Sequence, residues 1–267
     1  MIYETPNDAY LDTVRQLIYN PTHKSAPRGQ KIFEILHHQF TITSPSSAPL
    51  KTLDPDRNEK IEAYTKAEFE LYARGENTVV EFEKASKFWT KLQNPDGTIN
   101  SAYGWLIFYD RSCGNPLYEV PWITTKGDTA SAEKEALRTP WEWARLSLIT
   151  DKDSRQAVIK FHKRKHLWVG NKDQTCTLSG SFLIRNDRLH LIIHMRSNDV
   201  IKGLSYDLPW FCYLMERMCR ELKSTYPLLE IGTYTHFVDS LHVYESDLDL
   251  ACKLIGHNPQ EEFKSIA

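Results

Sequence analysis

Hydrophobic and polar positions alternate with a period of two in residues 179–197 of this chain. Two runs of strand-forming residues flank Asn186 and Asp187, a pair that favours a tight turn. In the second run, apolar residues occupy every second position from Leu189 to Met195. Because successive residues of a strand point to opposite faces of a sheet, this pattern predicts a β-hairpin with one buried face.

A period of three to four residues predicts helices elsewhere. Residues 58–77 carry apolar side chains at that spacing, and Gly75 is placed to end the helix. Another helix begins near Asp207, which we expect close to the N-cap, with Pro209 in the first turn. The other expected elements are helices over 5–20, 78–93 and 129–148, a strand over 31–42, and loops over 44–56 and 94–128.

The order of these elements bears on the number of domains. No internal repeat, low-complexity tract or linker interrupts them. A chain of 267 residues, 41% of them hydrophobic, can bury a sizeable core. This length fits one large α/β or α+β domain or two small ones, and the lack of a linker favours a single domain over residues 1–267.

Charge and cysteine content argue against several classes of protein. A net charge of −2 gives no electrostatic reason to expect a nucleic-acid polymer as partner. No apolar run approaches the roughly 18 residues of a membrane span, and the N-terminus MIYETPNDAY lacks the pattern of a signal peptide. Five cysteines without a C-x-x-C pair fit neither a disulfide framework nor a zinc site; they lie at positions 113, 176, 212, 219 and 252. We therefore expect a cytoplasmic protein with reduced thiols, no metal and no membrane partner.

Taken singly, the chemically interesting residues have ordinary explanations. A lone cysteine such as Cys176 is most often a small buried hydrophobe. Arg196 at the end of a strand could form a surface ion pair, Glu68 on a helix could face water, and Asp207 could cap a helix. The basic segment HKRKH (162–166) is typical of an exposed loop, although it could also bind a metal or a phosphate.

The spacing of these residues is more specific than their identities. Cys176 stands twenty residues before an Arg-Ser-Asn-Asp run at 196–199, which is followed by the turn KGLSYD ending at Asp207. Trp89 stands fourteen residues before Tyr103. The other motifs are EFELY around Glu68, DKDSRQ at 151–156, INSAYGW at 99–105 and SLHVY at 240–244.

In these motifs the chain resembles the thymidylate synthase family, and most of all the phage deoxycytidylate (dCMP) hydroxymethylases built on the same fold. The resemblance runs from about residue 24 to the C-terminus and is densest over 150–247. It implies an α+β protein with a large mixed β-sheet flanked by helices. It also implies a homodimer through the sheet, with active sites completed by both chains.

The resemblance assigns a role to each motif residue. Cys176 would be the nucleophile, with Arg196 favouring its thiolate, while Glu68 would manage proton transfers and Tyr103 would help to remove the C5 proton. The co-substrate would be 5,10-methylenetetrahydrofolate, held by Trp89, Asp199 and Gly203. The nucleotide would be held by Arg28, Arg155, Arg196, Ser197, Asp207, His242 and Tyr244, with Arg155 reaching the site of the neighbouring subunit.

Departures from the family pattern also matter. Gln156 stands where the second arginine of the phosphate motif is usual, so one phosphate contact is lost or supplied elsewhere. The usual Pro-Cys-His is Thr175-Cys176-Thr177 here, and the phosphate loop around Arg28 matches only loosely.

Asp207 bears on the choice of base. Thymidylate synthases carry Asn at this position, which suits uracil, whereas a carboxyl group can accept from the amino group of cytosine and share a proton with N3. An unpaired buried polar group costs about 1–3 kcal/mol, so Asp207 predicts cytosine over uracil. The expected reaction is folate-dependent 5-hydroxymethylation of dCMP in preference to CMP.

Two alternatives stay open at this stage. One is a methylating relative, either a dCMP 5-methyltransferase or an atypical thymidylate synthase. The other is a non-catalytic nucleotide or RNA binder that uses HKRKH and Lys160 as a basic patch, although such a protein has no need of a nucleophile.

Overall fold

The computed structural model describes residues 1–111 and 138–257. Its strands are β1 (Ile2–Tyr3), β2 (His23–Ser25), β3 (Ile32–Ile42), β4 (Val158–Lys160), β5 (Thr177–Arg185), β6 (Arg188–Met195), β7 (Asn198–Asp199) and β8 (Glu230–Tyr244). They form an eight-stranded sheet in the order β1-β3-β8-β6-β5-β4, with β2 on β3 and β7 on β8. Strands β6 and β8 are parallel, whereas β3 and β8, and β5 and β6, are antiparallel. The large mixed sheet confirms the expected fold class.

The predicted hairpin is present as β5 and β6. Asn186 and Asp187 form the turn with φ angles of 51° and 55°, the left-handed conformation that a tight two-residue hairpin loop requires. The apolar positions from Leu189 to Met195 are fully buried at every second residue. The alternation read from the sequence therefore marks the face of β6 that enters the core.

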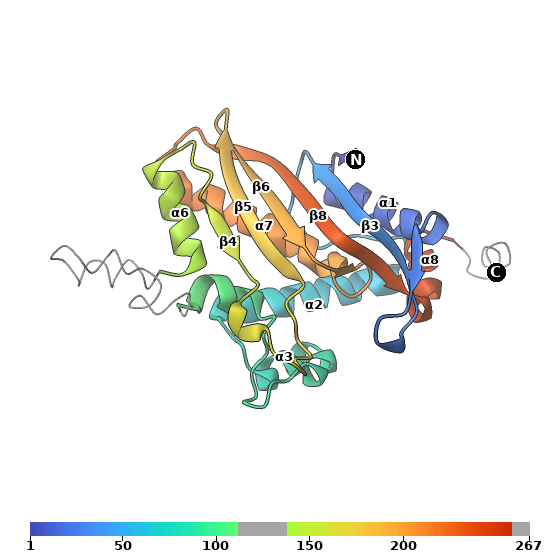
Figure 1. Cartoon of the computed structure of the whole chain (residues 1–267). Coiled ribbons are helices and arrows are strands. Elements are labelled where there is room, and N and C mark those ends of the chain that lie inside the picture. The colour runs from blue at the N-terminus through green and yellow to red at the C-terminus, as the bar shows by residue number, and fades with distance from the viewer. Residues whose placement is uncertain (112–137, 258–267) are drawn as a thin grey trace.

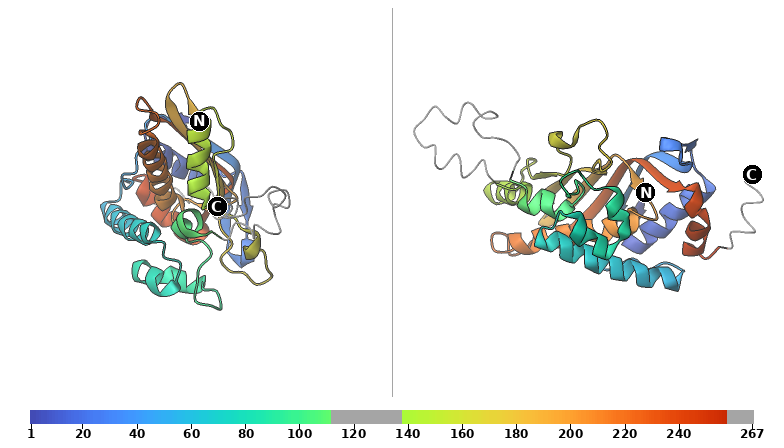
Figure 2. Two further views of the ribbon diagram at one scale, coloured as in Figure 1. Left: turned by 90° about the vertical axis from the view of Figure 1, so that its left-hand side faces the viewer. Right: turned by 90° about the horizontal axis from the view of Figure 1, so that it is seen from below.

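Helices cover one face of the sheet. The described helices are α1 (Pro6–Tyr19), α2 (Pro55–Arg74), α3 (Val79–Ala85), α6 (Pro140–Thr150), α7 (Leu204–Leu222) and α8 (Leu248–Leu254). Of these, α3 lies below the sheet in Figure 1 and packs mainly against α2 and the turn η2 (Lys87–Lys91). Helices α1, α2 and α7 lie behind the sheet in Figure 1, and the right-hand view of Figure 2 shows them on the same side of it. Side chains of these helices and of the sheet share one hydrophobic core.

Several element boundaries differ from the expectation. Helix α2 begins at Pro55, inside the expected loop, because the Asp54 side chain accepts from the backbone N–H of Arg57 and caps the helix. It ends as expected at Gly75, which has a φ of 70°. The expected helix 78–93 is broken at the extended residue Ser86 into α3 and the 3₁₀ turn η2 (Lys87–Lys91).

Two other expected regions are only partly as predicted. Within the expected helix 129–148, α6 begins at Pro140, where Thr139 forms a capping box with Glu142, and residues 129–137 lie outside the described residues. The expected loop 94–128 contains a short π-helical turn, η3 (Trp105–Tyr109).

The start of α7 corrects the expectation for Asp207. The helix begins at Leu204 with Gly203 at its N-cap, and no side chain makes a capping bond there. Asp207 lies in the first turn without capping it, and Pro209 lies inside the helix. The reason is a turn before the helix, in which Asp199 Oδ1 accepts from the backbone N–H groups of Ile201 and Lys202. The Asp207 carboxyl is therefore available for another role.

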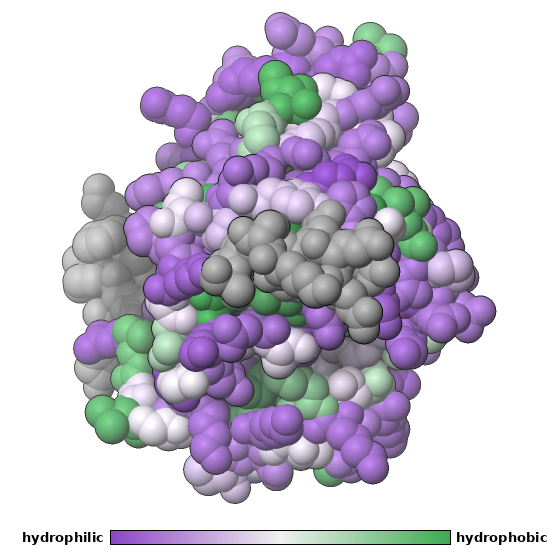
Figure 3. Space-filling view, turned by 90° about the vertical axis from the view of Figure 1, so that its right-hand side faces the viewer, coloured by the Kyte–Doolittle hydropathy of each residue, from purple (hydrophilic) through white to green (hydrophobic). Residues whose placement is uncertain are grey.

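The opposite face of the sheet has no helix over it among the described residues (Figure 1). Along β8, Tyr234, His236 and Val238 are buried on the helix side, whereas Phe237 on the other side is only partly covered. Ile192 of β6, on the same open side, is 40% exposed. By contrast, the end of the molecule seen in Figure 3 is mainly hydrophilic, with small separate apolar patches.

Candidate active site

Glu68 is held between two tyrosines of its own helix. Tyr64, Glu68 and Tyr72 are spaced four residues apart on α2, and such residues share one face of a helix. Both phenols donate to Glu68 Oε1, Tyr64 at 3.0 Å and Tyr72 at 3.1 Å. Trp89 in η2 donates from Nε1 to the Tyr64 hydroxyl at 2.9 Å, so the expected folate-side tryptophan and the expected proton-transfer residue belong to one hydrogen-bond chain.

Cys176 and Arg196 are neighbours because of the hairpin. They lie just outside its paired ends, where Thr177 faces Met195, and the Arg196 N–H donates to the Cys176 carbonyl at 2.9 Å. The guanidinium donates from Nε to the Thr175 carbonyl at 3.0 Å, and its Nη2 lies 3.7 Å from Cys176 Sγ. The twenty-residue spacing of the motif is thus the length of a two-stranded hairpin and its turn.

The thiol of Cys176 is less acidic than we expected. Burial raises its pKa to about 11, the positive charge of Arg196 opposes this rise, and the charges of Asp207, Asp173 and Asp199 add to it. The charge of Arg196 favours the thiolate, but burial and the three carboxylates outweigh it. In this arrangement the sulfur carries a proton at neutral pH.

Asp207 faces the same centre from α7. Asn198 of β7 donates from Nδ2 to Asp207 Oδ2 at 2.6 Å. Burial raises the pKa of Asp207 to about 6, the Asn198 hydrogen bond lowers it, and the charge of Asp199 raises it. A carboxyl group with such a pKa can both donate and accept a proton near neutral pH.

The two carboxyl groups of the site influence each other. Burial raises the pKa of Glu68 to about 8, the charge of Asp207 adds to the rise, and the hydrogen bonds from Tyr64 and Tyr72 oppose it. Burial, followed by the charges of Asp207 and Cys176, also raises the pKa of Tyr103. The structure therefore places three predicted catalytic residues, Glu68, Tyr103 and Cys176, each within electrostatic reach of Asp207.

Tyr103 is placed by close packing against α2. Its ring stacks on Tyr72 with the centroids 5.9 Å apart, and on Phe211 of α7 at 6.1 Å. A Cβ atom at Gly104 would lie 2.2 Å from the backbone oxygen of Tyr72, so this position admits only glycine. The Tyr-Gly pair of the sequence motif therefore has a packing reason.

A second group of predicted residues lies where β7 meets β8. Asp199 is the register partner of His242, and the His242 and Tyr244 rings are 5.3 Å apart, edge to face. Burial, followed by the charge of Asp199, raises the pKa of Tyr244, and the charge of Arg28 opposes this. Arg28 itself is exposed and has a φ of 53° in the turn η1 (Pro27–Gly29). Arg28 thus lies close enough to act electrostatically on Tyr244, one of the expected nucleotide-binding residues.

Arg155 lies away from this group within its own chain. It precedes β4 beside the far end of β5, where Arg185 Nη2 donates to the Asp153 carbonyl at 3.2 Å. Cys176 precedes the other end of the nine-residue strand β5, which at about 3.3 Å per residue places the two ends roughly 25–30 Å apart. Ser197, by contrast, directly follows Arg196 and is half-buried.

Three residues of the site were missed by the sequence reasoning: Tyr64, Tyr72 and Asn198. The tyrosines could have been found, because they stand four residues before and after Glu68 on a predicted helix. Asn198 stands at the variable position of the Arg-Ser-x-Asp motif, and its contact with Asp207 depends on how β7 lies against α7.

Two lysines of the basic loop HKRKH form ion pairs within the chain. Lys163 and Lys165 both pair with the buried Asp110, with N–O distances of 3.7 Å and 3.2 Å, and His166 is 4% exposed. The ion pairs with Asp110 offset part of the positive charge of the loop, while the Lys165 side chain stays 52% exposed. This weakens the case for a nucleic-acid binder, which depends on unpaired basic side chains.

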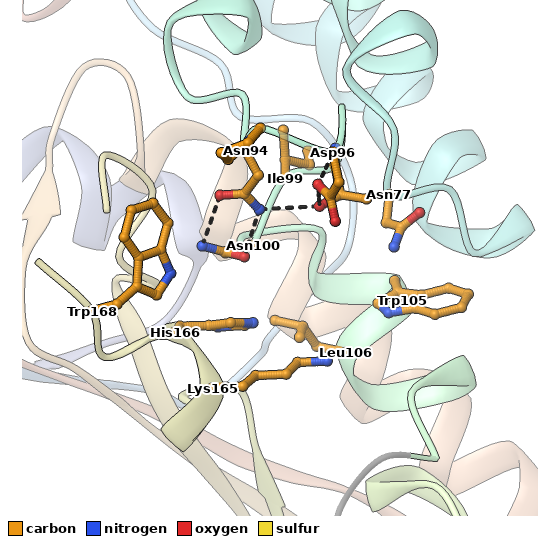
Figure 4. Close-up of a pocket in the computed structure, with 12 residues that line it drawn as sticks. Asn77, Asn94, Asp96, Ile99, Asn100, Trp105, Leu106, Lys165, His166 and Trp168 are labelled. Atoms are coloured by element: carbon orange, nitrogen blue, oxygen red, sulfur yellow. Dashed lines mark hydrogen bonds between the residues drawn. The ribbon is translucent and has the colours of Figure 1, made fainter. Parts of the chain in front are cut away.

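Beside this loop lies a pocket of about 590 Å³ (Figure 4). Its asparagines are mutually bonded, since Asn94 Nδ2 donates to Asn100 Oδ1 at 2.9 Å and Asn100 Nδ2 donates to the Asp173 carbonyl at 3.1 Å. Asp173 Oδ2 also accepts from the Ser101 N–H at 2.8 Å. The polar wall of the pocket thus braces the segment before Cys176 against the segment before Tyr103.

Two further structural findings concern residues 1–111 and 138–257. In these ranges no group of three or more His, Cys, Asp or Glu side chains is arranged to hold a metal ion. No helix in the same ranges is both long and apolar enough to cross a membrane.

Comparison with known proteins agrees with this geometry. The family described as "Thymidylate synthase" matches residues 8–266. Among solved structures, thermostable thymidylate synthase A from Bacillus subtilis superposes with a TM-score of 0.63 at 16% identity, over 93% of this chain and 83% of that one. At this identity the structural likeness concerns the fold alone.

Two phage enzymes are similar in sequence. Deoxycytidylate 5-hydroxymethyltransferase of Enterobacteria phage T6 is 25% identical over 59% of this chain and 56% of its own length. Deoxyuridylate hydroxymethyltransferase of Bacillus phage SP01 is 27% identical over 91% of this chain and 58% of its own length. The chain thus spans little more than half the length of these relatives.

Proposed function

The chain belongs to the thymidylate synthase family, and on this premise we propose that it catalyses folate-dependent 5-hydroxymethylation of dCMP in preference to CMP. The one-carbon unit would come from 5,10-methylenetetrahydrofolate and the hydroxyl oxygen from water. The two similar phage enzymes are both named hydroxymethyltransferases, which supports this product over a methyl group. A dCMP 5-methyltransferase or an atypical thymidylate synthase is the alternative within the family.

The observation that carries this proposal is the state of Asp207. Its Oδ2 accepts from Asn198, while its Oδ1 accepts no hydrogen bond within the described part of the chain. With a pKa of about 6, the group can hold a proton on its free oxygen or release it. Cytosine offers an amino donor and a bare N3 acceptor, so a carboxyl group that shares a proton with N3 satisfies both. Uracil carries a hydrogen on N3, so its N3–H and a protonated Asp207 would be two donors facing each other.

The proton that Asp207 shares with N3 also affects how readily Cys176 loses its own proton. The charge of Asp207 is one of the causes that keep the Cys176 thiol protonated. As sulfur adds to C6 of the base, the thiol proton would pass to the ionised Asp207, which shares it with N3, so the negative charge of Asp207 beside the sulfur is reduced. The addition gives C5 the electron density to form a bond to the one-carbon unit. Loss of the C5 proton would release tetrahydrofolate from the new carbon as its bond to the folate nitrogen breaks. Water would then add to that carbon, and release of sulfur from C6 would complete the reaction.

Glu68 and Tyr103 are the proposed proton carriers of these later steps. Glu68, with a pKa of about 8, is protonated near pH 7 and can both donate a proton and order a water molecule. Tyr103 lies within electrostatic reach of Cys176 and Asp207 and is proposed to assist removal of the C5 proton.

The proposed folate site fits the residues present. Asp199 Oδ1 is used by two backbone N–H groups, whereas its Oδ2 accepts no hydrogen bond in the described ranges and is left for a pterin donor. Trp89 is 7% exposed and is fixed through Tyr64 next to Glu68. Gly203 contributes by its lack of a side chain, because a Cβ there would lie 2.9 Å from the Asp199 carbonyl. When bound, the folate supplies the one-carbon unit.

We further propose that the phosphate is bound at Arg196, Ser197 and Arg28, and the sugar at His242 and Tyr244. Arg196 Nη1 makes no hydrogen bond in the described ranges and remains for a phosphate oxygen. A homodimer through the open sheet face would cover Ile192 and Phe237 and would allow Arg155 to serve the partner's site. A single domain over residues 1–267 is supported by one sheet and one core. The thiols, which form no disulfide among the described cysteines, support a cytoplasmic location.

A second candidate function is hydroxymethylation of dUMP. The phage SP01 relative, named for deoxyuridylate, matches 91% of this chain, a larger share than the T6 enzyme does. The carboxyl group of Asp207 argues against uracil as the base.

The test is mass spectrometry of the nucleotide after incubation with 5,10-methylenetetrahydrofolate and, separately, dCMP, CMP or dUMP. We expect a hydroxymethyl group on dCMP, less on CMP and least on dUMP. A methyl product with dihydrofolate would move the enzyme to the methylase branch, and preference for dUMP would reject the assignment of the base. Asp207→Asn should lower activity on dCMP and raise activity on dUMP, with a change in their ratio of roughly 5- to 150-fold.

A further inference from the structure

Asn198 is the direct partner of the residue that we propose reads the base. It lies in β7, 2% exposed, with its backbone in register with Leu241 of β8. Its Nδ2 donates to Asp207 Oδ2 at 2.6 Å. Within the described ranges this is the only hydrogen bond that the Asp207 side chain accepts.

The orientation of the Asn198 amide follows from this contact. Its Oδ1 is buried and has no hydrogen-bond partner in the described part of the chain. Turning the amide over would set Oδ1 against Oδ2 of the carboxylate, two acceptors facing each other. The ionised form of Asp207 therefore selects the orientation in which Asn198 donates.

Gly203 allows this pair to pack closely. A Cβ atom at Gly203 would lie 3.0 Å from Asn198 Nδ2 and 3.2 Å from Asp207 Oδ2. The backbone of the turn before α7 therefore lies directly against the pair and limits the movement of both side chains. Oδ2 lies against this turn and keeps one lone pair for the amino group of cytosine, whereas Oδ1 is left to share a proton with N3.

We propose that Asn198 is a positioning residue that gives Asp207 its preference for cytosine. By donating to Oδ2 it stabilises negative charge on that atom, so the proton that Asp207 binds resides on Oδ1. Oδ1 with its proton matches the bare N3 of cytosine and opposes the N3–H of uracil. The inference rests on the proposed function and adds a second residue to its choice of base.

Several ionisable groups surround Asp207 and must be considered in any pH experiment. Glu68 and Tyr72 face it from α2, Tyr103 from the segment before η3, and Cys176 from the segment before β5. Asp199 of β7 and Tyr234 of β8 complete the set. Asn198 cannot titrate, so replacing it by leucine changes the pKa of Asp207 without adding or removing a charge.

The experiment compares Asn198→Leu, which keeps the size of the side chain but not its donor, with the wild-type enzyme. The kcat/KM for dCMP divided by that for dUMP should fall about tenfold, as expected for loss of a hydrogen bond to a charged group. The pKa assigned to Asp207 in the pH profile of kcat/KM for dCMP should move to higher pH, because Asn198 lowers it.

A second variant and a control separate positioning from folding. Asn198→Asp sets two carboxyl groups against each other and should move the same pKa further upward, even if Asn198→Leu folds poorly. Asn58→Leu removes a structural amide that bonds to Thr52, at the start of α2. It should leave both the ratio and the pH profile unchanged, whatever it costs in thermal stability.

The outcomes distinguish this inference from the proposed function. A wild-type enzyme that makes no product from any nucleotide, or that prefers dUMP, overturns the proposed function. A wild-type enzyme that prefers dCMP, together with Asn198 variants of unchanged ratio and unchanged pH profile, overturns the role of Asn198 alone.

Discussion

Glu68 is buried and Asp207 is partly buried, both on helices, and burial raises the pKa of each carboxyl group, yet their surroundings differ. Glu68 Oε1 accepts from two phenols of its own helix, one of which is held in turn by Trp89. Asp207 Oδ2 accepts from one amide, supplied by another element of the fold. The first arrangement is local in sequence, and the second is assembled by tertiary structure.

The consequence is that the two groups differ in protonation near pH 7. Glu68, with a pKa of about 8, is mostly protonated, while Asp207, with a pKa of about 6, is mostly ionised. Each carboxylate disfavours ionisation of the other, so they titrate as a pair. Environments that drive two pKa values apart are the usual way in which one site supplies both a proton donor and a proton acceptor.

The largest effect that we expect comes from removing the donor of this pair. Glu68→Gln keeps the shape and the phenol contacts but cannot transfer a proton, so kcat should fall about 10²- to 10⁴-fold with little change in KM. Steady-state kinetics with dCMP would measure this. Glu62→Gln, on the same helix but exposed in an ion pair with Lys51, should retain full activity. Equal losses in the two variants would contradict the role of Glu68.

The pH dependence of folding stability should distinguish the two carboxyl groups, because they titrate over different pH ranges. Between pH 4.5 and about 8 the folded state keeps a proton on Glu68 that the unfolded state has lost. The free energy of unfolding should therefore fall as pH rises through this range, by at most about 1.4 kcal/mol per pH unit. Glu68→Gln should remove the fall between about pH 6 and 8. Asp207→Asn should remove the part that Asp207 contributes between pH 3.8 and about 6, and should also lower the upper end of the Glu68 range, because the charge of Asp207 raises the pKa of Glu68.

Urea unfolding at several pH values would measure these slopes. Above the pKa of Asp207, Glu68 is the only one of these two groups that still titrates. The slope of the free energy of unfolding in that pH range therefore reports on Glu68. A wild-type slope there that survives in Glu68→Gln would show that another group causes it.

The smallest effect concerns the two phenols that hold Glu68. Tyr64→Phe and Tyr72→Phe each remove one hydrogen bond that lowers the pKa of Glu68, so both should raise that pKa slightly. Only Tyr64→Phe also leaves the Trp89 indole N–H without its acceptor, so it should destabilise the fold by about 1–3 kcal/mol more. Thermal unfolding of the matched pair measures the difference, and equal stabilities would argue against the Trp89 contact.

The sequence by itself determined the local elements and much of the site. The hairpin was predicted because a period of two and the Asn186-Asp187 turn are properties of adjacent residues. The end of α2 at Gly75 follows from capping in the same way. The spacing between Cys176 and Arg196 is likewise local, since a hairpin alone brings them together.

Only the tertiary structure decided what the site residues face. The contact of Asn198 with Asp207, the approach of Glu68 to Asp207 and the high pKa of Cys176 arise between elements that no local pattern relates. The start of α7 at Leu204 was missed because it depends on Asp199 and Gly203 in the preceding turn. Burial and the distances between distant charges set these properties, and both exist only once the chain has folded.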